Sequence, residues 1–295
     1  MKEFQSNFES ADLLQEAKLV NYLTAHDIPT ARFIETIDGR LFFEYANHLI
    51  CLEEYIDGTT YGYYNFPKEI MPEVARTLAK LHNCLEGYEL PADLGKEWLE
   101  SFSVENELAK YSRLIEVLEE HKEDKNYDRI KADFIYRQQL VLKGKEYIKY
   151  FDGITYKATH GDFQGCQLIC EDMHIKGVVD FSSAGTLPAV WEIMRSYMHT
   201  NADCRSKASL DVADFAEYVR EYMMYSTLTR KDIEAMPYVY LFKMMRSTYG
   251  YPQYLLTDSD DREGLLEYGI WKTRILKEVE SKAELIVREL NYGRC

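Results

Sequence analysis

Residues 159–181 constrain the fold of this 295-residue chain more strongly than any other stretch. A polar loop carries Asp162, and a carboxamide, Gln167, follows five residues later. Two short apolar strands then flank a polar turn at residues 171–173, and Asp180 ends the second strand. Because a hairpin returns the chain to the edge from which it started, we expect Asp162, Gln167 and Asp180 to converge there.

Three oxygen-bearing side chains in this order suit phosphoryl transfer. One carboxylate can accept or orient the proton of a substrate hydroxyl, while an amide and a second carboxylate hold magnesium against the nucleotide phosphates. The protein-kinase catalytic loop has the same spacing from Asp to amide, with Asn in place of Gln, and a metal-binding Asp after a hairpin. Taken singly, an Asp in such a loop is more often a turn residue or a cap. A hydrolase that uses paired carboxylates without a nucleotide is the other enzymatic interpretation.

The stretch resembles the core motif of the aminoglycoside phosphotransferase and choline kinase-like family. That motif reads His-Gly-Asp, four residues, Asn, and then a hairpin to Ile-Asp-Phe or Ile-Asp-Trp. The chain has His160-Gly161-Asp162 and, after the hairpin, Val179-Asp180-Phe181. A Pro with an acidic residue four positions later completes the family pattern, and these are Pro188 and Glu192 here.

The resemblance implies an α+β fold, the bilobal protein-kinase-like fold. Its N-lobe would be truncated to a helix plus antiparallel strands, and its C-lobe would be mostly helical. We expect the partial N-lobe and the hinge in residues 1–57. The helical C-lobe, with the catalytic loop and the metal-binding hairpin, is expected in residues 58–295.

Roles for single residues also come from the resemblance. It implies that Asp162 is the catalytic base, that Asp180 is the main magnesium ligand, and that His160 and Glu192 brace the loop. Gln167 stands where the family has Asn. The extra methylene displaces the amide oxygen by about 1.5 Å, and the magnesium octahedron tolerates little distortion. Gln167 is therefore expected either to bind magnesium from a slightly shifted backbone or to lose that contact.

At the N-terminus the pattern predicts one helix followed by short antiparallel strands. In the family, the strand before this helix carries a Lys that pairs with a helix Glu and steadies the α- and β-phosphates; Lys2 and Glu16 fall at those places. A solvated terminal Lys and a surface Glu are the plain alternative. The family's two earlier strands and the loop over the phosphates have no counterpart in these residues, hence the truncated N-lobe. The helix is expected at residues 10–25 and the strands at 32–36, 41–45 and 48–55.

The segment after the last of these strands would be the hinge between the lobes. Backbone groups of Glu54, Tyr55 and Ile56 would face the adenine of the nucleotide, a mode of binding that demands no particular side chain. An ordinary exit from a strand into a loop predicts the same residues. Further along, His82 is a lone histidine on an apolar helix face and is expected to be a satisfied core residue.

Composition limits the classes of partner. The formal net charge of −15 argues against nucleic acid or an anionic membrane. It is compatible with a cationic small acceptor, although acidity also serves solubility. No run approaches 18 apolar residues and no signal peptide is recognisable, so a cytoplasmic protein that does not span a membrane is expected. The six cysteines form no pair of Cys-x-x-Cys motifs and are expected to be free thiols.

These observations predict a small-molecule phosphotransferase. It would use ATP or GTP with magnesium and phosphorylate a hydroxyl of a small acceptor. A catalytically inactive kinase-like scaffold or binding protein is the alternative, as the related spore-coat kinase-like proteins suggest. The identity of the acceptor, the choice between ATP and GTP, and the oligomeric state are left open by the sequence.

Overall fold

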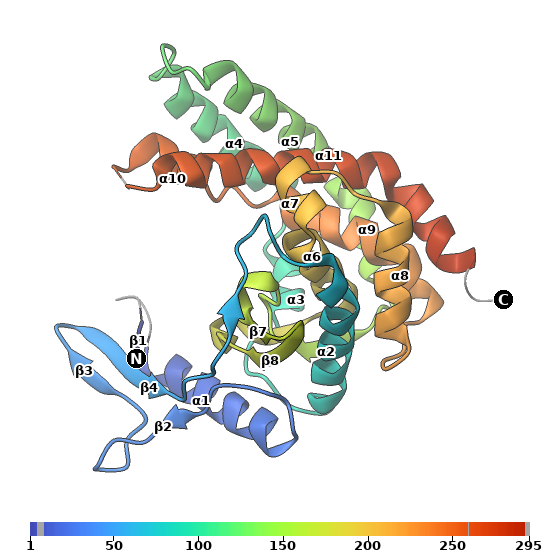
Figure 1. Ribbon diagram of the computed structural model, residues 1–295. Helices are drawn as coiled ribbons and strands as arrows, with labels where there is room; N and C mark the ends of the chain where they lie inside the picture. Colours follow the sequence, from blue (N-terminus) through green and yellow to red (C-terminus); the bar gives the residue numbers. More distant parts are fainter. Residues whose placement is uncertain (5–8, 259, 293–295) are drawn as a thin grey trace. The chain divides into compact units, whose positions relative to one another are not determined.

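The computed structural model describes residues 1–4, 9–258 and 260–292 (Figure 1). The chain forms two compact units. The expected division into lobes after Asp57 stays a prediction. The first unit comprises Met1–Asp93, Tyr156–Ala202 and Glu217–Thr227, and the second comprises Leu94–Thr155, Asp203–Ala216 and Leu228–Cys295.

A small antiparallel sheet and one helix form the N-terminal part of the first unit (Figure 1). The central strand is β4 (His48–Glu53), which pairs with β1 (Lys2–Glu3), β2 (Phe33–Ile34) and β3 (Phe43–Tyr45). Helix α1 (Ser10–Ala25) has the predicted bounds, because its apolar residues recur every three or four positions and are buried. The three strands after α1 lie where the sequence predicted them, but they are shorter.

The predicted hairpin is also present in the first unit. Strand β7 (Leu168–Glu171) pairs antiparallel with β8 (His174–Val178), and β5 (Thr59–Thr60) pairs with β7 as well. The two turn residues between β7 and β8, Asp172 and Met173, have φ of 49° and 65°. These left-handed values are those of a type I′ turn, whose twist matches that of the strands it joins.

A two-stranded sheet and two helices also belong to the first unit. Strand β6 (Tyr156–Thr159) pairs with β9 (Gly185–Pro188), and helix α2 (Met71–Cys84) packs against β6, β8 and α6 (Ala189–Thr200). Every residue of α6 except Arg195 is buried. Short 3-10 turns lie at Lys68–Ile70, Gly165–Gln167 and Phe181–Ser183.

The regular elements of the second unit are all helices in its described residues. Helix α9 packs against α5 and α11, α4 packs against α5, and α10 packs against α11. Helix α8 (Val212–Met223) contributes residues to both units. The elements of the second unit are α3 (Leu94–Glu100), α4 (Val104–Glu119), α5 (Tyr127–Ile148), a 3-10 turn (Lys149–Phe151), α7 (Ala202–Lys207, without its first residue), α9 (Arg230–Met245), α10 (Tyr251–Leu256) and α11 (Arg262–Tyr292).

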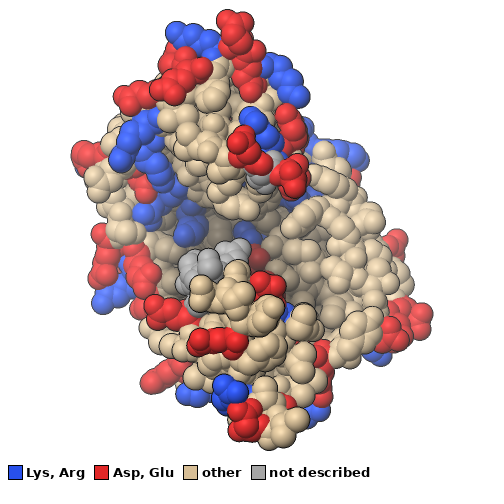
Figure 2. All heavy atoms as spheres, turned by 90° about the vertical axis from the view of Figure 1, so that its left-hand side faces the viewer, with Lys and Arg blue, Asp and Glu red and all other residues tan. Residues whose placement is uncertain are grey.

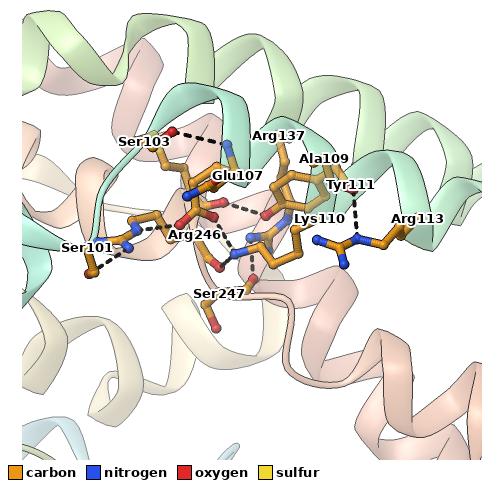
Figure 3. Close-up of polar contacts among 12 residues, drawn as sticks. Ser101, Ser103, Glu107, Ala109, Lys110, Tyr111, Arg113, Arg137, Arg246 and Ser247 are labelled. Atoms are coloured by element: carbon orange, nitrogen blue, oxygen red, sulfur yellow. Dashed lines mark hydrogen bonds and ion pairs between the residues drawn. The ribbon is translucent and has the colours of Figure 1, made fainter.

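A cluster of charged side chains holds the C-terminal end of α9 (Figure 3). The last carbonyls of a helix lack partners within the helix, and here side chains from α4 and α5 supply them. Arg137, fully buried, donates to the carbonyls of Met244 and Ser247 at 3.0 and 2.8 Å. Tyr111 donates to the carbonyl of Met245, and Lys110 donates to that of Arg246 at 2.6 Å.

Charged side chains of both signs are interspersed on the face shown in Figure 2, so the net charge of −15 does not form a single patch there. No helix in the described part of the chain is long and apolar enough to cross a membrane. Cys295 lies outside the described residues. The described cysteines carry free thiols, as expected: Cys51, Cys84, Cys166, Cys170 and Cys204.

Candidate active site

The loop that carries Asp162 is shaped by a close approach of backbone to backbone. Gly161 has a φ of 80°, and a Cβ at this position would lie 1.8 Å from the carbonyl oxygen of Ser183. Both the left-handed conformation and the contact exclude a residue with a side chain. The Gly of the motif is therefore required by the packing of the loop against the turn that follows Asp180.

Glu192, in the first turn of α6, holds this loop from within the core. Its fully buried carboxylate accepts hydrogen bonds from the backbone N–H groups of His160 and Gly161. His82, also fully buried, donates from Nε2 to the same carboxylate at 2.8 Å, and its Nδ1 lies 2.8 Å from the hydroxyl of Tyr222. Both ring nitrogens of His82 are thus engaged, which confirms the prediction of a satisfied core histidine.

The side chain of His160 links the two ends of the hairpin region. Its Nε2 donates to the carbonyl of Val179 at 3.0 Å, and its Nδ1 accepts from the backbone N–H of Asp162 at 3.3 Å. Burial lowers the pKa of His160, although the carboxylate of Glu192 opposes this effect. The ring is therefore neutral at neutral pH, in the one tautomer that both hydrogen bonds require.

The two carboxylates lie on either side of one amide group. Gln167 Nε2 is 3.4 Å from Asp162 Oδ2 and 3.3 Å from Asp180 Oδ2. The amide of Gln164 donates to the same oxygen of Asp162 at 3.0 Å. The structure thus brings Asp162, Gln167 and Asp180 together, as a hairpin between them requires. The positive end of an amide dipole lies in the space between the two carboxylates.

Asp180 has an unusual backbone conformation, with φ 64° and ψ 69°. Asp is one of the few residues that adopt this left-handed region readily. Its Oδ1 accepts from the Ser182 hydroxyl at 2.8 Å and from Lys2 Nζ at 3.3 Å. Burial alone would raise the pKa of Asp180, but the Lys2 ammonium and the Ser182 hydroxyl outweigh burial and lower it. The group is therefore a carboxylate at neutral pH.

Lys2 lies among three carboxylates. Its Nζ is 2.8 Å from Glu16 Oε1, 3.3 Å from Asp180 Oδ1 and 3.8 Å from Glu53 Oε1. Burial would lower the pKa of Lys2, but the carboxylates, Glu16 first among them, raise it overall. Glu16 is only 3% exposed, and burial raises its pKa despite the ion pair. The structure thus brings Lys2 and Glu16 together, and it adds Glu53 to the expected pair.

The residues expected at the hinge follow β4. The Glu54 carboxylate pairs with Arg32 at the surface, and the Glu54 backbone N–H donates to the Arg32 carbonyl at 2.8 Å. Tyr55 is 87% exposed, and the Ile56 side chain lies over Gly177 of β8. These positions fit a strand exit, and contact of Glu54, Tyr55 and Ile56 with a nucleotide base stays a prediction.

Two residues next to Asp162 were not foreseen from the sequence. Arg195 Nη2 donates to Asp162 Oδ1, and Gln164 donates to Oδ2. Arg195 and Glu192 lie three residues apart on α6, so they share a helix face. That spacing was the available signal: once Glu192 is placed against the loop, Arg195 is directed to it as well.

The donor set is of the type that holds magnesium beside a nucleotide. Magnesium takes oxygen ligands and is usually held by one or two carboxylates plus substrate phosphates. Asp180 supplies such a carboxylate, and Gln167 can present its oxygen instead of its nitrogen by rotating the amide. In the described residues, no group of three or more His, Cys, Asp and Glu could hold a metal ion.

Comparison with known proteins gives one family and a set of similar structures. A model described as "Phosphotransferase enzyme family" matches residues 5–223. No curated protein sequence matches the chain. One similar solved structure is an amicoumacin kinase in complex with AMP-PNP, Ca²⁺ and Ami. It is 16% identical, with a TM-score of 0.60 over 93% of this chain and 78% of that chain.

Two further structures are similar over most of their length. A microcompartment-associated aminopropanol kinase is 13% identical, with a TM-score of 0.63 over 97% of this chain and 85% of that chain. A spectinomycin phosphotransferase in complex with ADP and spectinomycin is 11% identical, with a TM-score of 0.63 over 97% and 85% of the two chains. At these identities the likeness shows the fold alone, and it confirms the predicted α+β kinase-like fold.

Proposed function

Because this chain belongs to the phosphotransferase enzyme family, we propose that it transfers the γ-phosphoryl group of ATP or GTP to a hydroxyl of a small molecule. The observation that carries the proposal is the position of the Gln167 amide nitrogen, 3.4 Å from Asp162 and 3.3 Å from Asp180. Two carboxylates around one small space suit a magnesium ion and the phosphates that it holds.

Asp162 is the proposed catalytic base. Its carboxylate accepts the proton of the acceptor hydroxyl while the hydroxyl oxygen forms a bond to the γ-phosphorus, and the bond from that phosphorus to the bridging oxygen breaks. Hydrogen bonds from Gln164 and Arg195 to the two carboxylate oxygens hold the orientation of the group. The backbone N–H of Asp162 donates to the neutral ring of His160, so the backbone that carries the carboxylate is held in place.

Asp180 is the proposed main magnesium ligand, with Gln167 as a second one after its amide rotates to present the oxygen. When bound, magnesium would neutralise charge on the β- and γ-phosphates. Lys2, held by Glu16 at 2.8 Å, would contact the α- and β-phosphates. The backbone of Glu54, Tyr55 and Ile56 would face the adenine.

An amine-bearing alcohol is the proposed class of acceptor. The net charge of −15 favours a cationic acceptor over nucleic acid or an anionic membrane. The kinases of similar fold are named for aminopropanol, amicoumacin and spectinomycin, and these compounds define a first panel. A cytoplasmic location stays a prediction.

Release of ADP or GDP, measured with each acceptor of the panel, tests the proposal. We expect acceptor-dependent release from wild type, and a loss of about 100-fold or more in Asp162→Asn, since a positioned general base contributes about that much. Asp172→Asn is the matched control, because Asp172 is exposed in the left-handed turn of the same hairpin and Asn adopts that conformation readily.

The same assay, combined with a measurement of nucleotide binding, addresses the alternative of an inactive scaffold. Equal release of ADP or GDP from wild type and Asp162→Asn would refute the role of Asp162 as the catalytic base. Binding of the nucleotide with no transfer to any acceptor, in wild type as in the variant, would favour the scaffold.

A further inference from the structure

Arg195 is the exception in its helix. Every other residue of α6 is buried, whereas the Arg195 side chain is 14% exposed and its guanidinium reaches Asp162. Glu192 lies one turn earlier on α6 and holds the backbone of the same loop. One helix therefore fixes both the main chain of the loop and the carboxylate at its tip.

The guanidinium of Arg195 has hydrogen-bonding capacity that the described residues do not use. A guanidinium carries five N–H donors. One of those of Arg195 goes to Asp162 Oδ1, and another goes from Nη1 to His199 Nε2 at 3.2 Å. The Nε atom is buried and has no hydrogen-bond partner among the described residues. Buried donors of this kind are normally satisfied, so this guanidinium has capacity for a further acceptor.

His199 fixes how this guanidinium is held. Its Nδ1 lies 3.1 Å from the backbone carbonyl of Arg195, one turn earlier on α6. A carbonyl only accepts, so Nδ1 carries the proton and Nε2 is the acceptor that faces Arg195 Nη1. The guanidinium is thereby held by the His199 ring at Nη1 and by the Asp162 carboxylate at Nη2.

The charges around the site suggest which acceptor that is. Lys2 is surrounded by Glu16, Glu53 and Asp180, at the end of the site where the α- and β-phosphates would lie. Arg195 is at the other end, on the carboxylate that would receive the acceptor hydroxyl. In phosphoryl transfer, negative charge spreads over the three equatorial oxygens of the transferring group, and a planar guanidinium suits paired phosphate oxygens.

We propose that Arg195 is a catalytic residue that contacts the transferring γ-phosphoryl group, and that its pairing with Asp162 holds it ready when no nucleotide is bound. This inference rests on the proposed function. A hydroxyl bonded to Asp162 lies about 3 Å from that carboxylate, and the phosphorus it attacks lies about 3 Å further on. In this proposal the Arg195 side chain rotates to bring its guanidinium to the oxygens on that phosphorus. Arg195 gives up no proton, because an arginine stays charged; the proton of the hydroxyl passes to Asp162.

A transition-state analogue tests the inference without knowledge of the acceptor. Magnesium ADP with aluminium fluoride imitates the charge and the shape of the transferring group, whereas magnesium ADP alone lacks it. Calorimetric titration gives both affinities for each variant. We expect aluminium fluoride to tighten ADP binding to wild type, and Arg195→Met to lose about 100-fold of that gain, the usual effect of removing one oriented donor.

Three variants make the result specific. Arg76→Met is the matched control, because Arg76 pairs with Glu221 at 2.8 Å away from the loop, and it should keep the full gain. Arg195→Lys should recover only part of the gain, since one ammonium cannot contact two oxygens as a guanidinium does. In Arg195→Met the Asp162 carboxylate loses its ion-pair partner, and that unpaired charge could disturb folding. The double variant Arg195→Met/Asp162→Asn has no such charge, so a folding defect that occurs in the single variant but not in the double variant is caused by it.

Each outcome has one meaning. If wild type binds magnesium ADP more tightly with aluminium fluoride and Arg195→Met retains the gain, Arg195 does not contact the transferring group. If aluminium fluoride gives no gain in wild type, the inference is equally wrong, although the nucleotide binds. If wild type binds no magnesium ADP, it is the proposed function that fails, and the inference fails with it.

Discussion

Replacing Glu192 tests how firmly the core holds the candidate catalytic loop. Its fully buried carboxylate accepts hydrogen bonds from the backbone N–H groups of His160 and Gly161 and from the ring of His82. In Glu192→Ala all three donors lose their acceptor, and each buried donor left unpaired costs about 1–3 kcal/mol. Water that enters the vacated space relieves part of this cost. We therefore expect the free energy of unfolding to fall by about 4 kcal/mol.

Glu192→Gln is the matched comparison. The amide keeps one acceptor oxygen, but its NH₂ group faces at least one of the N–H donors, so one donor of the loop loses its partner. We expect a loss of about 2 kcal/mol in the free energy of unfolding. The size of the side chain is unchanged in Gln, so the loss in Glu192→Gln reports hydrogen bonds alone. The additional loss in Glu192→Ala reports the remaining hydrogen bonds and the packing of the side chain.

Thermal denaturation followed by circular dichroism measures both losses. For a chain of this size, 1 kcal/mol corresponds to about 2 °C in the midpoint, so we expect shifts of about 8 °C for Ala and about 4 °C for Gln. Equal shifts for the two variants, or a shift below about 2 °C for Ala, would refute the reasoning that these hydrogen bonds fix the loop.

Three further perturbations have defined outcomes. Gly161→Ala should lower the thermal midpoint and abolish transfer, because the new Cβ would lie 1.8 Å from the Ser183 carbonyl oxygen; an unchanged midpoint would contradict that packing. Arg137→Met should lower the free energy of unfolding by about 3 kcal/mol, because two carbonyls at the end of α9 lose their donor, whereas the exposed Arg113→Met on α4 should change it little. Because burial lowers the pKa of His160, its neutral ring contributes fully to stability above about pH 6.5, and this contribution is lost as the pH falls toward the lowered pKa. The thermal midpoint should therefore fall from pH 7 to pH 5, and less so in His160→Asn; equal slopes in both proteins would remove His160 as the cause.

Local patterns predicted much of the first unit. The bounds of α1 followed from its apolar spacing and the positions of the later strands from their alternation and turns, although β2 (Phe33–Ile34) and β3 (Phe43–Tyr45) are shorter than predicted. The convergence of Asp162 and Asp180 was predictable because only a hairpin separates them. Short-range structure of this kind depends on neighbouring residues, which the sequence displays directly.

Contacts between distant elements could not be foreseen in the same way. Glu53 joins Lys2 only because β4 pairs with β1, and Arg195 reaches Asp162 only because α6 packs beneath the loop. The capping of α9 by Arg137 likewise depends on how three helices pack. Such contacts require the tertiary arrangement, and the three-residue spacing of Glu192 and Arg195 becomes informative only once α6 is placed against the loop. The roles assigned to the hinge residues Glu54, Tyr55 and Ile56 stay predictions.

The central claim is that Asp162 and Asp180 share one magnesium nucleotide, and calorimetric titration with ATP tests it most directly. With magnesium present, Asp180→Asn should bind ATP at least about tenfold more weakly than wild type, a loss of about 1.4 kcal/mol, and without magnesium the two should bind alike. Asp162→Asn should keep most of the magnesium-dependent affinity, because its proposed role is to accept a proton. Equal affinities of wild type and Asp180→Asn for magnesium ATP would contradict the account.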